Sequence, residues 1–112
     1  MIDDGLLTVR EAQTRVDASI RSLGGYWPPL ANLARLFEEC GELARVVNQA
    51  YGPKLRKPGE ATVSASEELG DALYVLLVLA NSLDLDADAA LSATLEKVAA
   101  RVPTKPVDAS ES

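Results

Sequence analysis

Residues 68–80 read Glu-Leu-Gly-Asp-Ala-Leu-Tyr-Val-Leu-Leu-Val-Leu-Ala, and this stretch decides the fold. It lacks the alternation of polar and apolar residues that marks a half-buried strand, so it predicts a helix. From Ala72 to Ala80 such a helix is apolar on every side, which predicts burial on all faces. A single small domain has little surface to spare for this helix, so we expect a partner subunit to complete its cover.

The same stretch begins with a pair of carboxylates, and a second pair lies earlier in the chain. Glu68 and Asp71 are spaced i, i+3, as are Glu39 and Glu42 within the acidic segment 38–42. Residues at this spacing share one helix face. Four carboxylates facing the interior of a bundle are desolvated and repel one another unless a divalent cation neutralises them. Because oxygen-only ligands suit a hard ion, the pattern predicts Mg²⁺, with Mn²⁺ as the other candidate.

A simpler explanation of the acidic segment stays open at this point. Most glutamates on helices face water, and Arg35 and Arg45 lie within one turn of the glutamates. Opposite charges three or four residues apart form ion pairs that stabilise a helix. The local sequence therefore allows either a metal site or a set of ion pairs within one helix.

Capping and breaking residues divide the chain into four predicted helices. Thr8-Val9-Arg10-Glu11 and Ser64-Ala65-Ser66-Glu67 are capping boxes that begin the first and third helices. Gly24-Gly25 ends the first helix, and Asp86 caps the fourth. The predicted ranges are about 8–23, 29–50, 64–83 and 86–102. We therefore predict an all-α, four-helix bundle-like domain over residues 1–102, completed by dimerisation, and a flexible tail over 103–112.

Apolar residues at helical spacing mark the side of each helix that is expected to face the core. In the second helix the predicted stripe is Leu30, Leu33, Phe37, Cys40, Ala44 and Val47. In the fourth helix it is Leu91, Leu95, Val98 and Val102. Cys40 is thus expected to be a small buried residue. As the single cysteine it rules out an intrachain disulfide and fits a reducing compartment.

Charge and residue content exclude several classes of function. The chain has 112 residues, a formal net charge of −6 and no histidine. An acidic chain lacks the basic face that binds a nucleic-acid polymer, although a metal ion can bridge it to a single nucleotide. Without histidine, histidine-dependent triads, most zinc sites and the Glu-x-x-His ligands of ferritin-like bundles are excluded. The start of the chain has no signal-peptide pattern and the run 72–80 is too short to span a bilayer, so we expect a cytoplasmic protein with no membrane partner.

The spacing of the acidic residues resembles the signature of a known family. Glu38-Glu39-x-x-Glu42, a gap of 25 residues and Glu68-x-x-Asp71 are similar to the motif of the MazG-like nucleotide pyrophosphohydrolases. The similarity extends through 33–45 and 67–83, covers roughly residues 8–101 and is greatest to the short single-domain members. It implies an all-α MazG-type fold that forms a homodimer or a dimer of dimers, with sites where helices of two subunits meet.

The resemblance also implies an activity. Members of the family hydrolyse a nucleoside triphosphate between the α and β phosphates, which releases a monophosphate and diphosphate. By position, Glu39, Glu42, Glu68 and Asp71 match the Mg²⁺ ligands. Glu38 matches an additional acid that either helps to hold a further metal or orients the attacking water. Since the chain has no histidine, a glutamate is the expected general base, and the candidates are Glu38 and Glu39.

Several side chains are candidates for holding the substrate. The candidates to bind its outer phosphates are Lys54, Arg56 and Lys57 in the loop 51–63, and Lys97 and Arg101 in the fourth helix. The alternatives are a solvated loop and a solvated helix end without this role. The family often has Lys-Phe followed by Arg in that helix, whereas this chain has Lys97-Val98 and thus lacks the aromatic residue. Trp27 and Tyr74 are candidates to stack on a base, or else belong to the core. Asn81 lies on an apolar helix and is expected to bond either the nucleotide or a neighbouring backbone group.

Two alternative functions stay open. A relative with a narrower substrate range, such as a dUTP or phosphoribosyl-ATP pyrophosphohydrolase, is expected to have the same acidic residues. The alternative from another class is a helical module that binds a nucleotide or a protein without catalysis. The presence of all four predicted metal ligands speaks against such a module.

Overall fold

A computed structural model describes residues 6–51 and 64–101 of the chain. The described residues form four helices and no strand: α1 (Val9–Ser22), α2 (Pro29–Tyr51), α3 (Ala65–Ser82) and α4 (Ala87–Arg101). The predicted all-α fold is therefore confirmed, and Tyr51, which was expected in a loop, belongs to α2. None of the described helices combines the length and the apolar character that crossing a membrane requires. The predicted loop at 52–63 and the predicted tail at 103–112 lie outside the described residues.

Side-chain caps begin the helices where the sequence places them. The hydroxyl of Thr8 accepts from the backbone N–H of Glu11, and the Glu11 carboxylate accepts from the N–H of Thr8, both at 3.0 Å. Ser64 accepts from the N–H of Glu67 at 3.0 Å at the start of α3. Asp86 accepts from the N–H of Ala89 at 3.0 Å at the start of α4. Each cap satisfies a backbone donor that the first helical turn leaves without a partner.

Two glycines end α1 and turn the chain toward α2. Gly24 and Gly25 have φ angles of 108° and 99°, a backbone region that residues with a Cβ atom rarely adopt. The N–H of Gly25 donates to the carbonyl of Ile20 at 2.9 Å, which satisfies one of the last carbonyls of the helix. This glycine pair therefore confirms the predicted end of α1.

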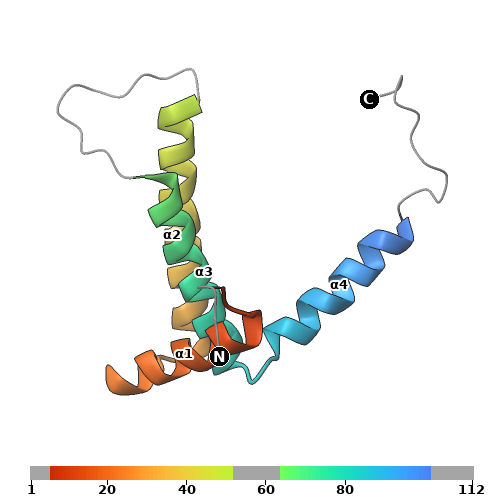
Figure 1. The fold of residues 1–112 in the computed structure, drawn as a ribbon. Helices are drawn as coiled ribbons and strands as arrows, with labels where there is room; N and C mark the ends of the chain where they lie inside the picture. The colour runs from red at the N-terminus through yellow and green to blue at the C-terminus, as the bar shows by residue number, and fades with distance from the viewer. Residues whose placement is uncertain (1–5, 52–63, 102–112) are drawn as a thin grey trace.

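The body of the molecule consists of α1, α2 and α3. The α2 and α3 helices lie side by side and antiparallel, and α1 crosses the end of the pair where α2 begins (Figure 1). Val16 and Ile20 of α1 pack against Val78 of α3 in the core. The hydroxyls of Ser19 and Tyr74 are hydrogen-bonded at 2.9 Å, so Tyr74 lies between α1 and α3.

The fourth helix leaves this body and projects away from it (Figure 1). No residue of α4 is buried, and its contacts with the body are made mainly with α1. Its predicted apolar stripe is exposed in the single chain, with Leu91 at 47%, Leu95 at 59% and Val98 at 49% of their residue surface. Val102 lies outside the described residues.

The predicted core face of α2 is wrong for the single chain. Leu30 and Phe37 are 80% and 68% exposed, and Cys40 is exposed as well. The buried or half-buried residues of α2 are Asn32, Leu33, Arg35, Leu36, Glu39, Leu43, Val46 and Gln49, and Leu33 is the one member of the predicted stripe among them. The reason is that α3 packs against the side of α2 that contains both Glu39 and apolar residues. The side with Leu30 and Phe37 is left facing outward.

The prediction that α3 is buried on all faces is also not met within one chain. Ala72, Val75 and Val78 are buried, whereas Leu73 and Leu76 are 51% and 45% exposed. This difference arises because α1 and α2 cover only one side of α3. The uncovered sides of α2, α3 and α4 are apolar, and they bear on the oligomeric state.

Replacement of a core valine tests this packing. Val75 is 1% exposed, and Val75→Ala removes two carbons from it. At about 0.8 kcal/mol per carbon plus a cavity contribution, we expect the free energy of unfolding to fall by about 2 kcal/mol in urea denaturation. Leu85→Ala removes a larger group from a residue that is 56% exposed, and its effect should stay below about 0.5 kcal/mol. Equal losses for the two variants would contradict the assigned core.

Candidate metal centre

Three carboxylates from two helices meet between α2 and α3. Glu39 of α2 and Glu68 and Asp71 of α3 each offer an oxygen, and these oxygens all lie within 4.8 Å of one another. The antiparallel packing of the two helices brings the two acidic segments together. We call Glu39, Glu68 and Asp71 the acidic triad; it contains three of the four metal ligands predicted from the sequence.

Burial and repulsion between carboxylates act most strongly on Glu68. It is the most buried member of the acidic triad, with 8% of its residue surface exposed. Desolvation raises the pKa of its carboxyl above the usual value, and the carboxylate of Asp71 raises it further. Glu42 and then Glu39 act on this pKa in the same direction, while the guanidinium of Arg45 opposes them. A cation bound here would relieve both the burial and the repulsion.

The acidic triad fits a hard divalent cation. All of its donors are carboxylate oxygens, which Mg²⁺ and Mn²⁺ prefer. Oxygens bound to one Mg²⁺ at about 2.1 Å lie at most about 4.2 Å apart, so the separations in the protein need to close only slightly. Glu39 is half-buried and Asp71 is exposed, so one side of the acidic triad is open to a ligand.

The two remaining acidic candidates have different surroundings. Glu42 accepts from Arg45 at 2.9 and 3.2 Å, so the ion pairing that the sequence left open is present for this residue. Arg35, the other arginine considered, lies over the ring of Trp27 at 5.6 Å from its centroid. Glu38 is exposed on α2 and is not part of the acidic triad.

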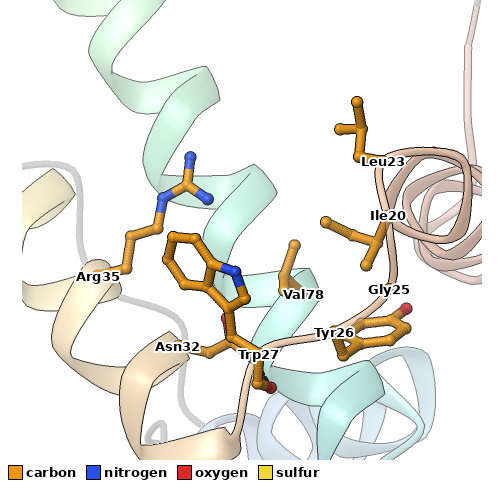
Figure 2. A pocket seen from close by; sticks show the side chains of 8 residues that line it. All are labelled: Ile20, Leu23, Gly25, Tyr26, Trp27, Asn32, Arg35 and Val78. Atoms are coloured by element: carbon orange, nitrogen blue, oxygen red, sulfur yellow. Dashed lines mark hydrogen bonds between the residues drawn. The ribbon is translucent and has the colours of Figure 1, made fainter.

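A cavity of about 140 Å³ lies at the start of α2 (Figure 2). Trp27 and Arg35 line it together with the apolar side chains of Ile20 and Val78. Asn32 is 2% exposed, and its amide donates to the carbonyl of Trp27 at 3.0 Å. The amide therefore fixes the position of the tryptophan backbone.

This cavity lies close to the acidic triad along α2. Arg35 precedes Glu39 by four residues, which is about one helical turn. Sequence reasoning missed both Arg35 as a lining residue and Asn32 as a buried one. The available signal was helical spacing: Asn32, Leu36 and Glu39 lie at i, i+4 and i+7. They therefore share one side of α2, the side that faces α3.

The other predicted substrate residues are not gathered around the acidic triad in the single chain. The amide of Asn81 bonds Gln13 of α1, with its oxygen accepting at 2.9 Å and its nitrogen donating at 3.1 Å. Lys97 and Arg101 are exposed on the outer half of α4 (Figure 1). Lys54, Arg56 and Lys57 lie outside the described residues.

The sequence and the fold together define a class of protein. The profile of the MazG nucleotide pyrophosphohydrolase domain matches residues 28–105, which include the whole acidic triad. The chain therefore belongs to the MazG family, a family of hydrolases that act on nucleotides.

Particular relatives agree with this assignment. The protein YpjD of Bacillus subtilis is 47% identical over 91 residues, which are 80% of this chain and 82% of YpjD. The crystal structure of YpjD, a candidate pyrophosphatase, has a TM-score of 0.74 at 46% identity and covers 87% of this chain and 97% of that one. The crystal structure of the Bacillus-conserved MazG protein, a nucleotide pyrophosphohydrolase, has a TM-score of 0.73 at 40% identity and covers 89% of this chain and 98% of that one.

The raised pKa of Glu68 predicts how stability depends on pH and metal. The folded carboxyl keeps its proton where the unfolded one has lost it, so the contribution of Glu68 to the stability of the metal-free protein falls as pH rises from about 4.5 through the raised pKa. At about pH 7.5, Glu68→Gln should therefore melt at a higher temperature than the wild type in EDTA. Bound Mg²⁺ should stabilise the wild type by about 2.7 kcal/mol at about 100 times its Kd, and Glu68→Gln should lose this gain.

Calorimetric melting curves with EDTA and with Mg²⁺ measure both effects. Glu96→Gln makes the same chemical change on exposed α4 and should leave both curves as in the wild type. Two results together would contradict this: a lower melting temperature for metal-free Glu68→Gln, and an unchanged response to Mg²⁺. They would show that the Glu68 carboxylate neither destabilises the metal-free protein nor binds the ion.

Proposed function

We propose that the protein is a Mg²⁺-dependent nucleoside triphosphate pyrophosphohydrolase. It converts a ribo- or deoxyribonucleoside triphosphate and water into the monophosphate and diphosphate, and removes unwanted nucleotides. The observation that carries the proposal is the convergence of Glu39, Glu68 and Asp71 within 4.8 Å in a chain of the MazG family.

Each acidic residue has a role in this proposal. The acidic triad holds the cation, and Glu42 joins it when its ion pair with Arg45 opens. The bound Mg²⁺ supplies positive charge for the phosphate oxygens as negative charge develops on them. Glu38 and Glu39 are the candidate bases that accept a proton from the attacking water.

The cavity near the start of α2 is suited to the nucleoside. Trp27 is 56% exposed and offers an aromatic ring on which a base can stack. Because Arg35 is one turn from Glu39, a base at Trp27 and phosphates at the acidic triad lie along the same side of α2. Asn81 remains a weaker candidate, since Gln13 already satisfies its amide.

The exposed apolar surfaces support a homodimer or a dimer of dimers. They run along three helices and comprise Leu30, Phe37 and Val47 of α2, Leu69, Leu73 and Leu76 of α3, and Leu91, Leu95 and Val98 of α4. Covering these side chains in an assembly removes apolar area from water, which stabilises the assembly. In such an assembly, Lys97 and Arg101 of one chain bind the outer phosphates at the acidic triad of its partner, and Lys54, Arg56 and Lys57 are further candidates for this role.

Product release tests the proposed reaction. Incubation with mixed ribo- and deoxyribonucleoside triphosphates and Mg²⁺ should release diphosphate and monophosphates. Glu39→Gln and Asp71→Asn should each lower kcat by at least about 100-fold, since each removes a carboxylate that would hold the cation acting on the phosphate oxygens. Glu96→Gln on α4 is the matched control and should keep full activity. Inorganic phosphate as the product, or full activity in both variants, would refute the proposed reaction or its site.

Individual substrates, with dUTP and phosphoribosyl-ATP among them, separate the proposal from its alternatives. Cleavage of dUTP or phosphoribosyl-ATP alone would define a narrower enzyme. Binding of triphosphates without any diphosphate release would define a module that binds nucleotides without catalysis.

The oligomeric state tests the proposed subunit contact. Size exclusion with light scattering should give a multiple of the 11.9 kDa chain mass. Leu95→Glu places a charge within the α4 stripe and should shift the protein toward 11.9 kDa, because burying an unpaired carboxylate is unfavourable. Ala93→Glu adds the same charge on the opposite side of α4 and should keep the oligomer. A wild-type protein of 11.9 kDa would remove the shared site.

A further inference from the structure

One amide side chain of α1 joins three parts of the fold. The Gln13 nitrogen donates to the side-chain oxygen of Asn81 in α3 and to the carbonyl of Leu85 between α3 and α4, both at 2.9 Å. The Gln13 oxygen accepts from the backbone N–H of Ala87, the first residue of α4, at 2.8 Å. Asn81 donates back to the carbonyl of Gln13 at 3.1 Å.

A second contact from α1 reaches the same place. Arg10 donates to one carboxylate oxygen of Asp86 at 3.0 Å, and the other oxygen of Asp86 caps α4 through Ala89. Arg10 and Gln13 are three residues apart and so share one face of α1. Both therefore hold the start of α4 from the same side.

Within residues 6–51 and 64–101, the rest of α4 has no hydrogen bond to α1, α2 or α3 comparable to these. None of its residues is buried, and its contacts with the body lie mainly with α1. A helix of 15 residues is about 22 Å long, so a rotation of about 20° at its first residue moves its far end by about 8 Å. The contacts at residues 85–87 therefore decide where the whole helix points.

We propose that Gln13, with Asn81 and Arg10, forms a clamp that sets the direction of α4. Gln13 is then a positioning residue for Lys97 and Arg101, and this second part rests on the proposed function. The clamp itself is a property of the fold and is tested without any substrate.

A distance measurement between spin labels tests the clamp. Ala18→Cys in α1 and Ala93→Cys in α4, both exposed, are labelled in the full chain with Cys40→Ser, and an excess of unlabelled chain isolates distances within one chain. The wild-type clamp should give one narrow distance distribution by double electron–electron resonance. Gln13→Met keeps the length of the side chain but removes its hydrogen bonds, so the distribution should broaden and shift.

The control and a second variant keep the result decisive. Thr14→Val changes the next residue, whose hydroxyl bonds the carbonyl of Arg10 within α1, and should leave the distribution narrow. If circular dichroism shows that Gln13→Met loses helix, Arg10→Met combined with Asp86→Asn removes the other contact at exposed residues and should broaden the distribution to a smaller extent. An unchanged distribution in the folded variants would overturn the clamp.

Kinetics separate positioning from a purely structural role. Displaced cations bind the substrate and the transition state equally poorly, so Gln13→Met should raise KM by roughly tenfold with little change in kcat. A fall in kcat at constant KM would overturn the positioning role. If the wild type releases no diphosphate, the proposed function fails, while the spin-label distances still decide whether the clamp exists.

Discussion

The crowding of negative charge between α2 and α3 is the constraint on which the candidate site depends. Glu68 is nearly buried and has carboxylates from both helices around it. An arrangement selected for stability alone would place apolar side chains there. The chain has such side chains on α2, at Leu30 and Phe37, yet these face outward and Glu39 faces inward. The choice of face is therefore explained by the ligand that the carboxylates hold in the proposed function.

Local chemistry made the helices and the acidic pairs predictable from the sequence. The caps at Thr8 and Asp86 involve residues three positions apart, so their hydrogen bonds depend on nothing distant. The i, i+3 spacing within each acidic segment likewise follows from helix geometry alone. The resemblance to the MazG family then indicated that the two segments meet, as the packing of α2 against α3 shows.

The parts that sequence reasoning missed depend on contacts between distant residues. Which face of α2 is buried is decided by α3, and counting apolar residues selected the wrong one. The pairing of Glu42 with Arg45 is local by contrast, and the sequence left it open because a metal ion was the other possible partner. The buried amide of Asn32 bonds the carbonyl of Trp27 in the link between α1 and α2, and the amide of Gln13 bonds the link between α3 and α4. Apolar packing alone is non-directional, so directional bonds of this kind determine the angles.

The free outer half of α4 has a consequence for how long a newly made chain survives. In the single chain, the described residues attach this helix at one end, and segments with few buried contacts open locally at low free energy. Proteases cleave chains through such openings. In the oligomer proposed above, turnover in a cell would then fall first on chains that have not yet assembled.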